Sequence, residues 1–397
     1  MIIKSQRILT DRGMISGALE IENDVIKNIR QINADQMKAD LDVKNCIIIP
    51  GIIDTHNHGM MGYGPSADAH AAENVSHWMK ALSSEGVTGA FPTCMDADAY
   101  DAVVEAQCMN MDGAQIMGIH SEGPYLNRVG EKGIDTGHPD ISMEHVQQMI
   151  DEGQGQLKLV AIAPELPGAD AAIQKFTENG IQCAMAHTNA SYEQAMHSFE
   201  AGITVTTHTA NVMTGIHHRD MGALGAALLN DDVYNEIICD GLHVRNEMIE
   251  IMLRTKNDAF HKFMMISDNI PMAGMAPGKY NFENFGVLNI TKEGFCLTDT
   301  GRLCGSAKSV LYGMKNLVVN MGMDIMDVSR MASLNPAQCY GFADHKGSIR
   351  IGKDADFAVL DDNFDCLMTF RQGRCVYDHN ADKELINPES YKKWRIS

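Results

Sequence analysis

The sequence predicts an α/β fold, a (β/α)8 TIM-like barrel that carries a small β-sandwich formed by the N- and C-terminal segments. The chain has 397 residues, a length that suits such a barrel with a satellite module. Its middle alternates apolar runs with segments of helical spacing, whereas both ends show short strand patterns separated by turns. We expect residues 1–48 and 346–397 to form the sandwich and residues 49–345 to form the barrel.

The two ends of the chain carry the strand patterns of the expected sandwich. Near the N-terminus, strands are predicted at Ile2–Leu9, Gly17–Glu22 and Val25–Ile32. Near the C-terminus, two strands are predicted within Lys346–Asp361 around a Gly-Lys-Asp turn, and a hairpin within Met368–Tyr377 around Gln372-Gly373. Because chain termini often lie close together, these strands can pair into one unit.

Eight apolar runs in the middle of the chain have the length and composition of buried parallel strands. They are Cys46–Asp54, Gly89–Thr93, Ile116–His120, Leu159–Pro164, Cys183–His187, Thr204–Thr209, Asn235–Asp240 and Lys262–Asp268. Helical spacing lies between them, at Ala71–Glu85, Ser142–Glu152, Ala169–Asn179, Ser191–Ala201 and Asn246–Lys256. Eight β/α units in series favour a closed barrel over an open sheet.

Composition narrows the range of partners and locations. Hydrophobic residues make up 45% of the chain and charged residues 21%, as in a soluble globular protein. A net charge of -20 argues against nucleic acid or an anionic membrane as partner, but a local cluster of donors can still bind a small anion. No signal peptide or membrane-length apolar run is visible. Ten cysteines without a C-x-x-C pair favour a reduced, cytoplasmic setting.

The segment Pro50–Gly59 ends an apolar run with two histidines, His56 and His58, separated by one residue. Alternate residues of a strand point to the same face, so both imidazoles would face the same way. Neutral imidazole is a good ligand for zinc, iron or manganese, so the pair is half of a metal site. An isolated His-x-His is more often a hydrogen-bonded or exposed pair, so the assignment depends on residues downstream.

Ionisable residues recur at the ends of the other predicted strands. Barrel active sites lie at the C-terminal ends of the strands, and an ionisable residue there is costly unless it is paired or bound to metal. Each residue alone could be a capping or hydrogen-bonded group, but their shared location predicts a metal site. These residues are Glu122, His187, His208, the pair Asp240 and His243, and Asp268.

Several of these motifs resemble the amidohydrolase superfamily, and within it the N-acetylglucosamine-6-phosphate deacetylases. The resemblance covers nearly the whole chain. It rests on Pro50–Gly59, His120-Ser-Glu-Gly-Pro-Tyr-Leu-Asn127, His208 with Asn211, His217-His-Arg219, Asp240-Gly-Leu-His243, Leu303-Cys-Gly-Ser306 and Gly352–Leu360. The Glu-Gly-Pro element distinguishes these deacetylases from other members of the superfamily, because many binuclear relatives use a carboxylated lysine where these deacetylases use a glutamate.

The resemblance implies that Glu122, His187 and His208 bind the main divalent metal, with zinc or iron expected. His56 and His58, with Glu122 and Asp268, could hold a second ion, so one or two ions per subunit remain open. General chemistry gives Asp268 the role of base and then acid in amide hydrolysis, with a simple metal ligand as the alternative.

For the substrate, the resemblance places Arg219 and His243 at the sugar phosphate, together with Asn211 and the Val212 backbone. Arg219 could instead pair with Asp220 or a neighbouring helix. Leu303 and Gly305 belong to a loop that precedes a predicted helix, where free N–H groups can face an anion, or where the chain simply turns into the helix.

The chain departs from the family on the substrate side. The deacetylases usually carry Lys-Gly-Ala-His after the Glu-Gly-Pro loop, and that histidine approaches the acetyl carbonyl. This chain has Lys132-Gly-Ile-Asp135, with His138 three residues later. Either His138 takes over, or a second metal polarises the carbonyl, or the substrate differs from the family's.

The resulting hypothesis is a cytoplasmic metal-dependent hydrolase, expected from the family to be a homodimer, that removes the acetyl group from an amino-sugar 6-phosphate. One alternative is an amidohydrolase of another amide, such as N-acetylgalactosamine 6-phosphate or an N-acyl amino acid, or a deaminase. A second is a catalytically silent protein that binds metal and sugar phosphate. The intact Asp268 argues against the silent protein.

Overall fold

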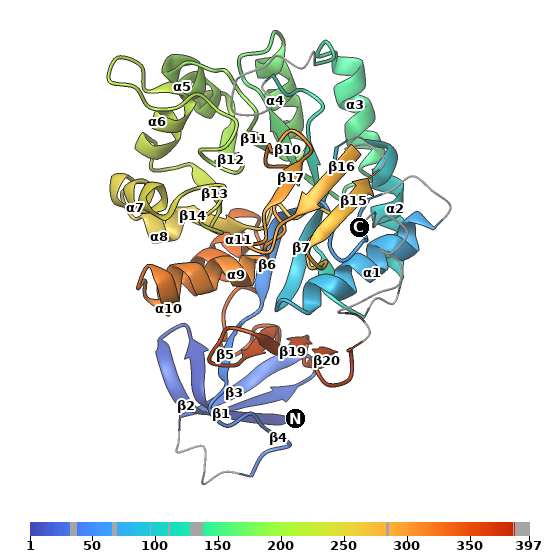
Figure 1. Cartoon of the computed structure of the whole chain (residues 1–397), viewed down its shortest axis with the longest axis vertical. Helices are drawn as coiled ribbons and strands as arrows, with labels where there is room; N and C mark the ends of the chain where they lie inside the picture. Colours follow the sequence, from blue (N-terminus) through green and yellow to red (C-terminus); the bar gives the residue numbers. More distant parts are fainter. Residues whose placement is uncertain are drawn as a thin grey trace.

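The computed structural model consists of a parallel barrel with a mixed sheet at one end, shown in Figure 1. It describes residues 1–31, 38–65, 70–95, 97–109, 112–127, 138–282, 286–383 and 385. Both ends of the chain contribute to the mixed sheet, and the barrel lies between them in sequence. The predicted fold class is confirmed.

The barrel strands follow the sequence in the order β6-β7-β9-β10-β11-β12-β13-β14, each parallel to the next. They are β6 (Ile52–Asn57), β7 (Val87–Cys94), β9 (Ile119–Glu122), β10 (Leu157–Ile162), β11 (Gln182–Met185), β12 (Ile203–Thr206), β13 (Tyr234–Ile238) and β14 (Phe263–Ile266). A short strand, β8 (Gln115–Ile116), pairs with β7 outside this path. The eight predicted runs therefore each contribute a barrel strand.

Helices follow the barrel strands and cover the barrel's outer face, as Figure 1 shows. They are α1 (Ala71–Ser83), η2 (Ala97–Ala99), α2 (Tyr100–Cys108), α3 (Met143–Glu152), α4 (Ala169–Glu178), α5 (Tyr192–Ala201), α6 (Gly222–Leu229), α7 (Asn246–Thr255), α8 (Ala259–Lys262), α9 (Val310–Lys315), η3 (Asn316–Asn320), α10 (Ile325–Ser329), η4 (Arg330–Leu334) and α11 (Asn335–Cys339). Local sequence sets their starts: Ser191 and Gln194 form a capping box that begins α5. None of the described helices has both the length and the apolar composition needed to cross a membrane.

The mixed sheet has the strand order β20-β19-β18-β5-β1-β2-β3, with β4 paired to β1. Its strands are β1 (Ile2–Thr10), β2 (Gly13–Glu22), β3 (Val25–Gln31), β4 (Leu41–Asp42), β5 (Ile47–Pro50), β18 (Phe357–Leu360), β19 (Cys366–Arg371) and β20 (Arg374–Asp378). The predicted run Cys46–Asp54 is thus divided, because Ile47–Pro50 belongs to the mixed sheet and Ile52 begins the barrel. The domain boundaries at residues 48 and 345 stay a prediction.

Sequence patterns did not predict a third sheet between β14 and α9. It is antiparallel, with β15 (Gly278–Phe282), β16 (Gly286–Ile290) and β17 (Cys296–Thr298). Its apolar side packs over Ile270, Met272 and Met275, which follow β14. The chain then returns to the barrel, where Ser306 pairs with Asn269. The insertion therefore rises from the same end of the barrel as Asp268.

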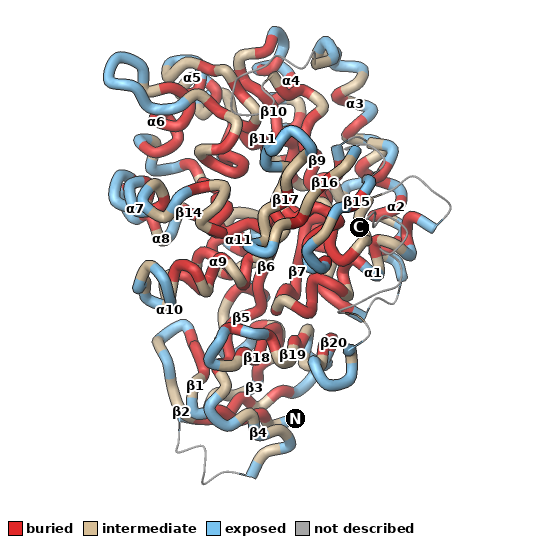
Figure 2. Tube along the Cα trace, viewed as in Figure 1, coloured by how far each residue is buried: buried red, intermediate tan, exposed pale blue. Residues whose placement is uncertain are grey.

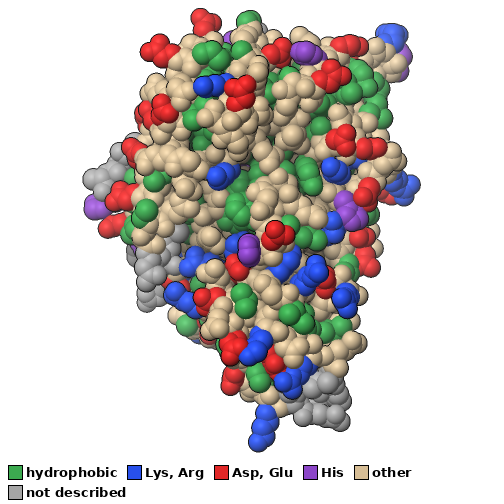
Figure 3. Space-filling view, turned by 180° about the vertical axis from the view of Figure 1, so that it is seen from behind, with side chains coloured by type: hydrophobic (Ala, Val, Ile, Leu, Met, Phe, Trp, Pro, Cys, Tyr) green, Lys and Arg blue, Asp and Glu red, His purple; other side chains and the backbone are tan. Residues whose placement is uncertain are grey.

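Buried apolar side chains occupy the layer between strands and helices, and Figure 2 shows the barrel strands mostly buried and the outer helix faces exposed. A separate core of isoleucines and phenylalanines, including Ile3, Phe357 and Phe370, fills the mixed sheet. On the face seen in Figure 3, acidic and basic side chains are interspersed and the basic ones lie mostly toward the mixed sheet. The net charge of -20 therefore forms no single continuous patch on that face.

The barrel closes between its first and last strands, β6 and β14. Among the described residues, no regular ladder joins the two strands; the end of β6 is linked to the residues after β14 by an isolated bridge between Asn57 and Asn269 and by two backbone bonds, from the Asp268 N–H to the His56 carbonyl (3.0 Å) and from the His58 N–H to the Asn269 carbonyl (2.7 Å). Inside the seam, the Ser267 hydroxyl donates to Asp54 Oδ2 (2.6 Å) and accepts from Asn57 Nδ2 (2.8 Å). These buried bonds fix the end of β14 against the end of β6.

We expect Ser267→Ala to lower the free energy of unfolding by about 2–4 kcal/mol, because buried polar groups of Asp54 and Asn57 lose their partner. Urea unfolding measures this change. Ser198→Ala is the matched control, since this buried hydroxyl donates only to the Ala195 carbonyl one turn earlier in α5 (2.7 Å). An equal loss in both variants would contradict a special role for the seam.

Candidate metal centre

Six ionisable side chains gather at the C-terminal end of the barrel, as the strand-end pattern predicted. They form two groups, His56 with His58 and Asp268, and Glu122 with His187 and His208; within each group the candidate ligand atoms lie within 4.8 Å of one another. His56 lies in β6 and Glu122 is the last residue of β9, whereas the others directly follow β6, β11, β12 and β14. Residues from five strands therefore converge on one place.

Glu122 faces both groups with its two carboxylate oxygens. Its Oε1 lies 3.0 Å from His187 Nε2 and 3.0 Å from His208 Nε2. Its Oε2 lies 3.0 Å from His58 Nε2 and 3.7 Å from His56 Nε2. The carboxylate thus has the position of a bridge between two histidine pairs.

Asp268 completes the group formed by the first strand. Its Oδ1 lies 3.4 Å from His56 Nε2 and 3.5 Å from His58 Nε2. The His56 ring is fully buried, whereas the Asp268 side chain keeps 16% of its surface exposed. Asp268 therefore lies between the histidines and solvent, where a substrate can reach it.

The distances fit a bound divalent cation better than hydrogen bonds alone. In each pair the two Nε2 atoms lie 3.1 Å apart, and each also points at a carboxylate oxygen. If both rings donate protons to the carboxylates, their N–H groups face each other at this short distance. A tetrahedral ion with ligands at 2.0–2.1 Å has ligand–ligand edges of about 3.3 Å, close to the separations seen here. The nitrogen and oxygen donors suit zinc or iron.

The backbone is strained at three of these six residues. His187, His208 and Asp268 have φ values of 45°, 33° and 50°, in the left-handed region that residues with a Cβ rarely adopt. Such a conformation costs about 1–3 kcal/mol per residue and persists where the surrounding structure enforces it. The strain turns the three side chains inward just beyond their strands.

The mutual electrostatics keep both carboxylates ionised. Burial raises the pKa of Glu122, but the His56 charge and hydrogen bonds from His187 and His208 outweigh burial and hold it well below its usual range. Burial also opposes ionisation of Asp268, yet the His56 charge and a His58 hydrogen bond lower its pKa to about 2. In turn, these carboxylates overcome the effect of burial on His58 and raise its pKa to about 10. The two carboxylates are therefore ionised, and a divalent cation that replaces the histidine protons would meet two negative charges.

Buried polar groups beneath the cluster were not singled out from the sequence. Glu236 lies on β13 with its Oε1 accepting from the Thr55 hydroxyl (2.7 Å) and its Oε2 4.0 Å from His56 Nδ1. Burial, the dominant cause, raises its pKa to about 7. His120 packs edge-on against His56, with ring centroids 4.6 Å apart. The sequence signal for Glu236 was a charged residue inside an apolar strand.

On the substrate side, the structure brings His243 and Asn211 to the same end of the barrel. His243 follows β13, is half-buried, and its Nδ1 lies 2.7 Å from Asp240 Oδ2. Asn211 and Val212 directly follow His208, and the Asn211 N–H donates to the His208 carbonyl (2.8 Å). At Gly305, a Cβ would lie 2.4 Å from Ile270 Cγ2, so only glycine fits beside the loop of Asp268.

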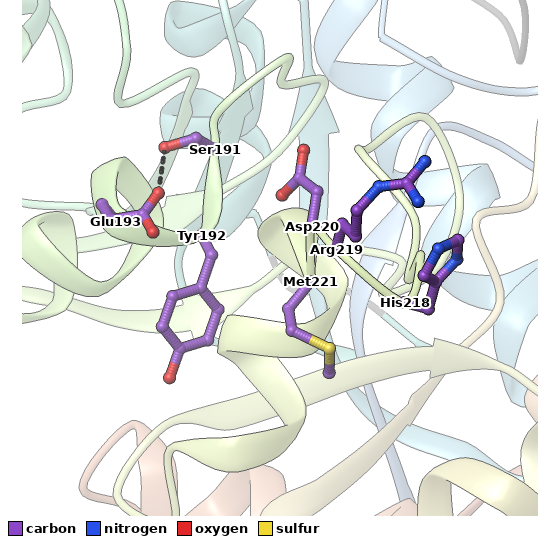
Figure 4. A pocket seen from close by; sticks show the side chains of 7 residues that line it. All are labelled: Ser191, Tyr192, Glu193, His218, Arg219, Asp220 and Met221. Carbon is purple, nitrogen blue, oxygen red and sulfur yellow. Dashed lines mark hydrogen bonds between the residues drawn. The ribbon is translucent and has the colours of Figure 1, made fainter.

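Other predicted substrate residues do not join the cluster in the described structure. Arg219 is exposed and lines a pocket of about 450 Å³ with residues from the start of α5 and the start of α6, shown in Figure 4. Figure 4 shows the Arg219 guanidinium and the Asp220 carboxylate pointing apart, and the alternative that Arg219 pairs with Asp220 or a neighbouring helix stays a prediction. His138 Nδ1 lies 3.2 Å from the Pro139 carbonyl, Leu303 is 41% exposed, and Asp135 lies outside the described residues.

Comparison with known proteins identifies the family of this arrangement. The model of the amidohydrolase family matches residues 47–376. The chain belongs to the amidohydrolase family. Among its members, the chain is 30% identical over 388 residues to an N-acetylglucosamine-6-phosphate deacetylase of Vibrio furnissii, covering 94% of each protein. It is also 30% identical over 385 residues to an N-acetylgalactosamine-6-phosphate deacetylase of Escherichia coli O157:H7, covering 94% of this chain and 98% of that protein.

Solved structures of amidohydrolases agree with this assignment. An N-acetylglucosamine-6-phosphate deacetylase from Pasteurella multocida superposes with a TM-score of 0.82 at 26% identity, over 94% of this chain and 99% of its own. The Mycobacterium smegmatis enzyme, in complex with N-acetyl-D-glucosamine-6-phosphate, superposes with a TM-score of 0.84 at 25% identity, over 95% and 99% of the two chains. The recognised resemblance to this deacetylase group of the amidohydrolases is confirmed.

We expect Glu122→Gln to reduce the metal that the protein retains after dialysis. Changing a residue that hydrogen-bonds to a metal ligand typically weakens metal binding roughly 10- to 100-fold, and we expect a larger loss for Glu122→Gln. The reason is that Glu122 faces both histidine pairs. Elemental analysis of the purified protein measures the metal.

Two comparisons make this test specific. His58→Ala should spare the ion held by Glu122, His187 and His208, so it should lower metal content less than Glu122→Gln does. Glu85→Gln is the matched control, because this half-buried glutamate lies before β7 at the other end of the barrel and accepts from the Ser309 hydroxyl (2.7 Å). Normal metal content in the Glu122 variant would contradict the bridging position.

Proposed function

We propose that this amidohydrolase removes the acetyl group from an N-acetyl-amino-sugar 6-phosphate, giving the amino-sugar phosphate and acetate. The observation that carries the proposal is the Glu122 carboxylate shared between two histidine pairs, with Asp268 on the side open to substrate. The names of the relatives support the substrate class, since the matched curated proteins are deacetylases of N-acetylated amino-sugar 6-phosphates.

We propose zinc or iron as the cofactor. Glu122, His187 and His208 would hold the main ion, and His56, His58, Glu122 and Asp268 a second one. When bound, such an ion supplies Lewis acidity, which lowers the pKa of water and polarises a carbonyl oxygen. The second pair of histidines is what makes room for two ions per subunit.

Asp268 is the proposed proton carrier. Its carboxylate is ionised at neutral pH because its pKa is about 2, despite burial, under the influence of His56 and His58. It can therefore accept a proton from the attacking water and return it to the departing amine. Its partial exposure at the mouth of the barrel places these transfers where substrate enters.

His243, after β13, is the proposed partner of the substrate phosphate, with Asn211 and the Val212 backbone, after β12, as further proposed contacts. Burial opposes protonation of His243, but the hydrogen bond and charge of Asp240, with the charge of Asp268, outweigh it and raise its pKa. A protonated imidazole suits a phosphate oxygen. The roles of Arg219, His138, Leu303, Gly305 and Asp135 at the substrate stay predictions, as do the homodimer and the cytoplasmic location.

Two alternatives concern catalysis and the identity of the sugar. A catalytically silent binder is disfavoured by the placement of Asp268 beside both histidines. An N-acetylgalactosamine 6-phosphate substrate is named for one curated relative at 30% identity, whereas relatives from Vibrio furnissii, Bacillus subtilis and Danio rerio are N-acetylglucosamine-6-phosphate deacetylases, which favours the glucosamine epimer. The proposed cytoplasmic location, a reducing environment, is supported by the cysteines, because all ten are free thiols.

We expect Asp268→Asn to lower kcat on the order of a hundredfold or more, because the amide cannot accept the proton. The variant keeps one carboxamide oxygen toward His56 and His58, so metal at the Glu122–His187–His208 group should persist. Steady-state kinetics and metal analysis on the same sample separate the two effects. Undiminished turnover with full metal would remove Asp268 from this role.

Substrate class is tested by acetate release from a matched set of compounds. N-acetylglucosamine 6-phosphate and its galactosamine epimer should both exceed the unphosphorylated sugars and N-acetyl amino acids in kcat/KM by about tenfold or more, since each charge-assisted hydrogen bond to phosphate contributes roughly 1.5–3 kcal/mol. The ratio of kcat/KM for the glucosamine compound to kcat/KM for the galactosamine compound shows which sugar is the preferred substrate. Equal rates with and without phosphate would contradict the sugar-phosphate proposal.

A further inference from the structure

His243 is held by one nitrogen and offers the other. Its Nδ1 lies 2.7 Å from Asp240 Oδ2, while its Nε2 is buried with no hydrogen-bond partner of normal geometry; the Gly305 backbone also acts on the ring and raises its pKa. The side chain keeps 9% of its surface exposed and Asp240 keeps 2%. A buried ring nitrogen without a partner is costly, so it marks a place where a ligand group is expected.

Asp240 is itself fixed from three directions. Its Oδ1 accepts the backbone N–H groups of Leu242 (2.8 Å) and His243 (2.9 Å). Its Oδ2 accepts the Ser306 hydroxyl (3.3 Å) in addition to facing His243. Because the carboxylate is anchored by backbone as well as side chain, the imidazole bonded to it has little freedom to rotate.

The same anchor connects this pair to Asp268. The Ser306 N–H donates to the Asp268 carbonyl (2.8 Å), and the Ser306 carbonyl accepts from the Ile270 N–H (3.1 Å). Ser306 therefore contacts Asp240 with its side chain and the segment of Asp268 with its backbone. Ser306 thus links the Asp240–His243 pair to the segment that carries Asp268.

We propose that Asp240 is a positioning residue that holds His243 with its Nε2–H directed at the anionic group of the substrate, so that a phosphate monoester meets an imidazolium. This rests on the proposed function, which supplies the phosphate. The partner of Nδ1 determines which protonation state of the ring can donate from Nε2. Asp240 accepts the Nδ1 proton, so a neutral ring would present a lone pair at Nε2, and donation from Nε2 requires the doubly protonated ring.

The variant Asp240→Asn tests this on the metal-loaded enzyme. The amide Oδ1 can still accept both backbone N–H groups, but the negative charge beside His243 is lost. We expect KM for the phosphorylated substrate to rise about tenfold or more above the pH at which the variant's imidazole loses its proton, because the charge-assisted hydrogen bond from the imidazolium to the phosphate is lost. We expect kcat to change less than about twofold, because His243 does not take part in the proton transfer.

The pH profile separates positioning from a loss of fold. The charged groups that face the His243 ring are Asp240 on its own turn and Asp268 after β14. In the wild type, KM should rise as pH passes the raised pKa of His243, and in the variant this rise should begin at lower pH. At a pH low enough to protonate His243 in both proteins, the two KM values should therefore converge. A general structural defect would raise KM at every pH.

A matched control comes from the surface. Asp258 and His261 form the same pair three residues apart, with Oδ1 and Nδ1 2.5 Å from each other, but both side chains are largely exposed at α8. Asp258→Asn should leave KM and its pH profile unchanged. The unphosphorylated sugar should also show no difference between wild type and Asp240→Asn.

His243→Gln makes the two possible failures distinguishable. If it raises KM for the phosphorylated substrate while Asp240→Asn does not, the positioning role is overturned and the proposed function stands. If His243→Gln has no effect on the phosphorylated substrate, the phosphate placement of the proposed function fails and the inference fails with it. Non-additive effects in the double variant would support the pair acting as a unit.

Discussion

The active end of this protein depends on the seam where the barrel closes, between β6 and β14. A barrel of parallel strands has no free edge only if its first and last strands pair, and here they do so through backbone bonds at His56, His58, Asp268 and Asn269. The buried bonds among Asp54, Asn57 and Ser267 reinforce the pairing from inside. Asn57 also accepts the Trp78 indole N–H (2.6 Å), which ties the seam to α1. His56, His58 and Asp268 thus join the seam with their backbones and the candidate metal centre with their side chains.

The centre itself concentrates groups that destabilise an empty barrel. Four imidazoles and two carboxylates share a largely buried volume, and three of the six residues have left-handed backbone conformations. Desolvation and strain of this kind are typical of functional sites, where the surrounding structure carries the cost. A bound divalent cation would offset this cost, because the closely spaced nitrogen and oxygen atoms would then serve as metal ligands at ordinary separations. Folding and metal binding are therefore expected to be thermodynamically linked.

The chemistry is divided between rigid and variable parts of the barrel. The metal-facing residues lie in strands or directly after them, and the strands are tied to neighbours on both sides. The residue Arg219, predicted to contact substrate, lies in a longer connection before α6. Loops can change specificity without disturbing the strands that hold the metal.

The sequence by itself determined the fold class and the members of the metal cluster. Period-two and helical patterns are local, so eight strand runs and the intervening helices were visible, and histidines and carboxylates at strand ends were recognisable because barrels use those ends. It did not reveal the insertion β15–β17, the division of Cys46–Asp54 between two sheets, or Glu236 beneath His56, because these depend on contacts between residues far apart in the chain. Only the tertiary structure decided that Glu122 faces both histidine pairs and that Arg219 lies apart from His243. Distances between strand ends arise from closure and strand tilt, which no local pattern encodes.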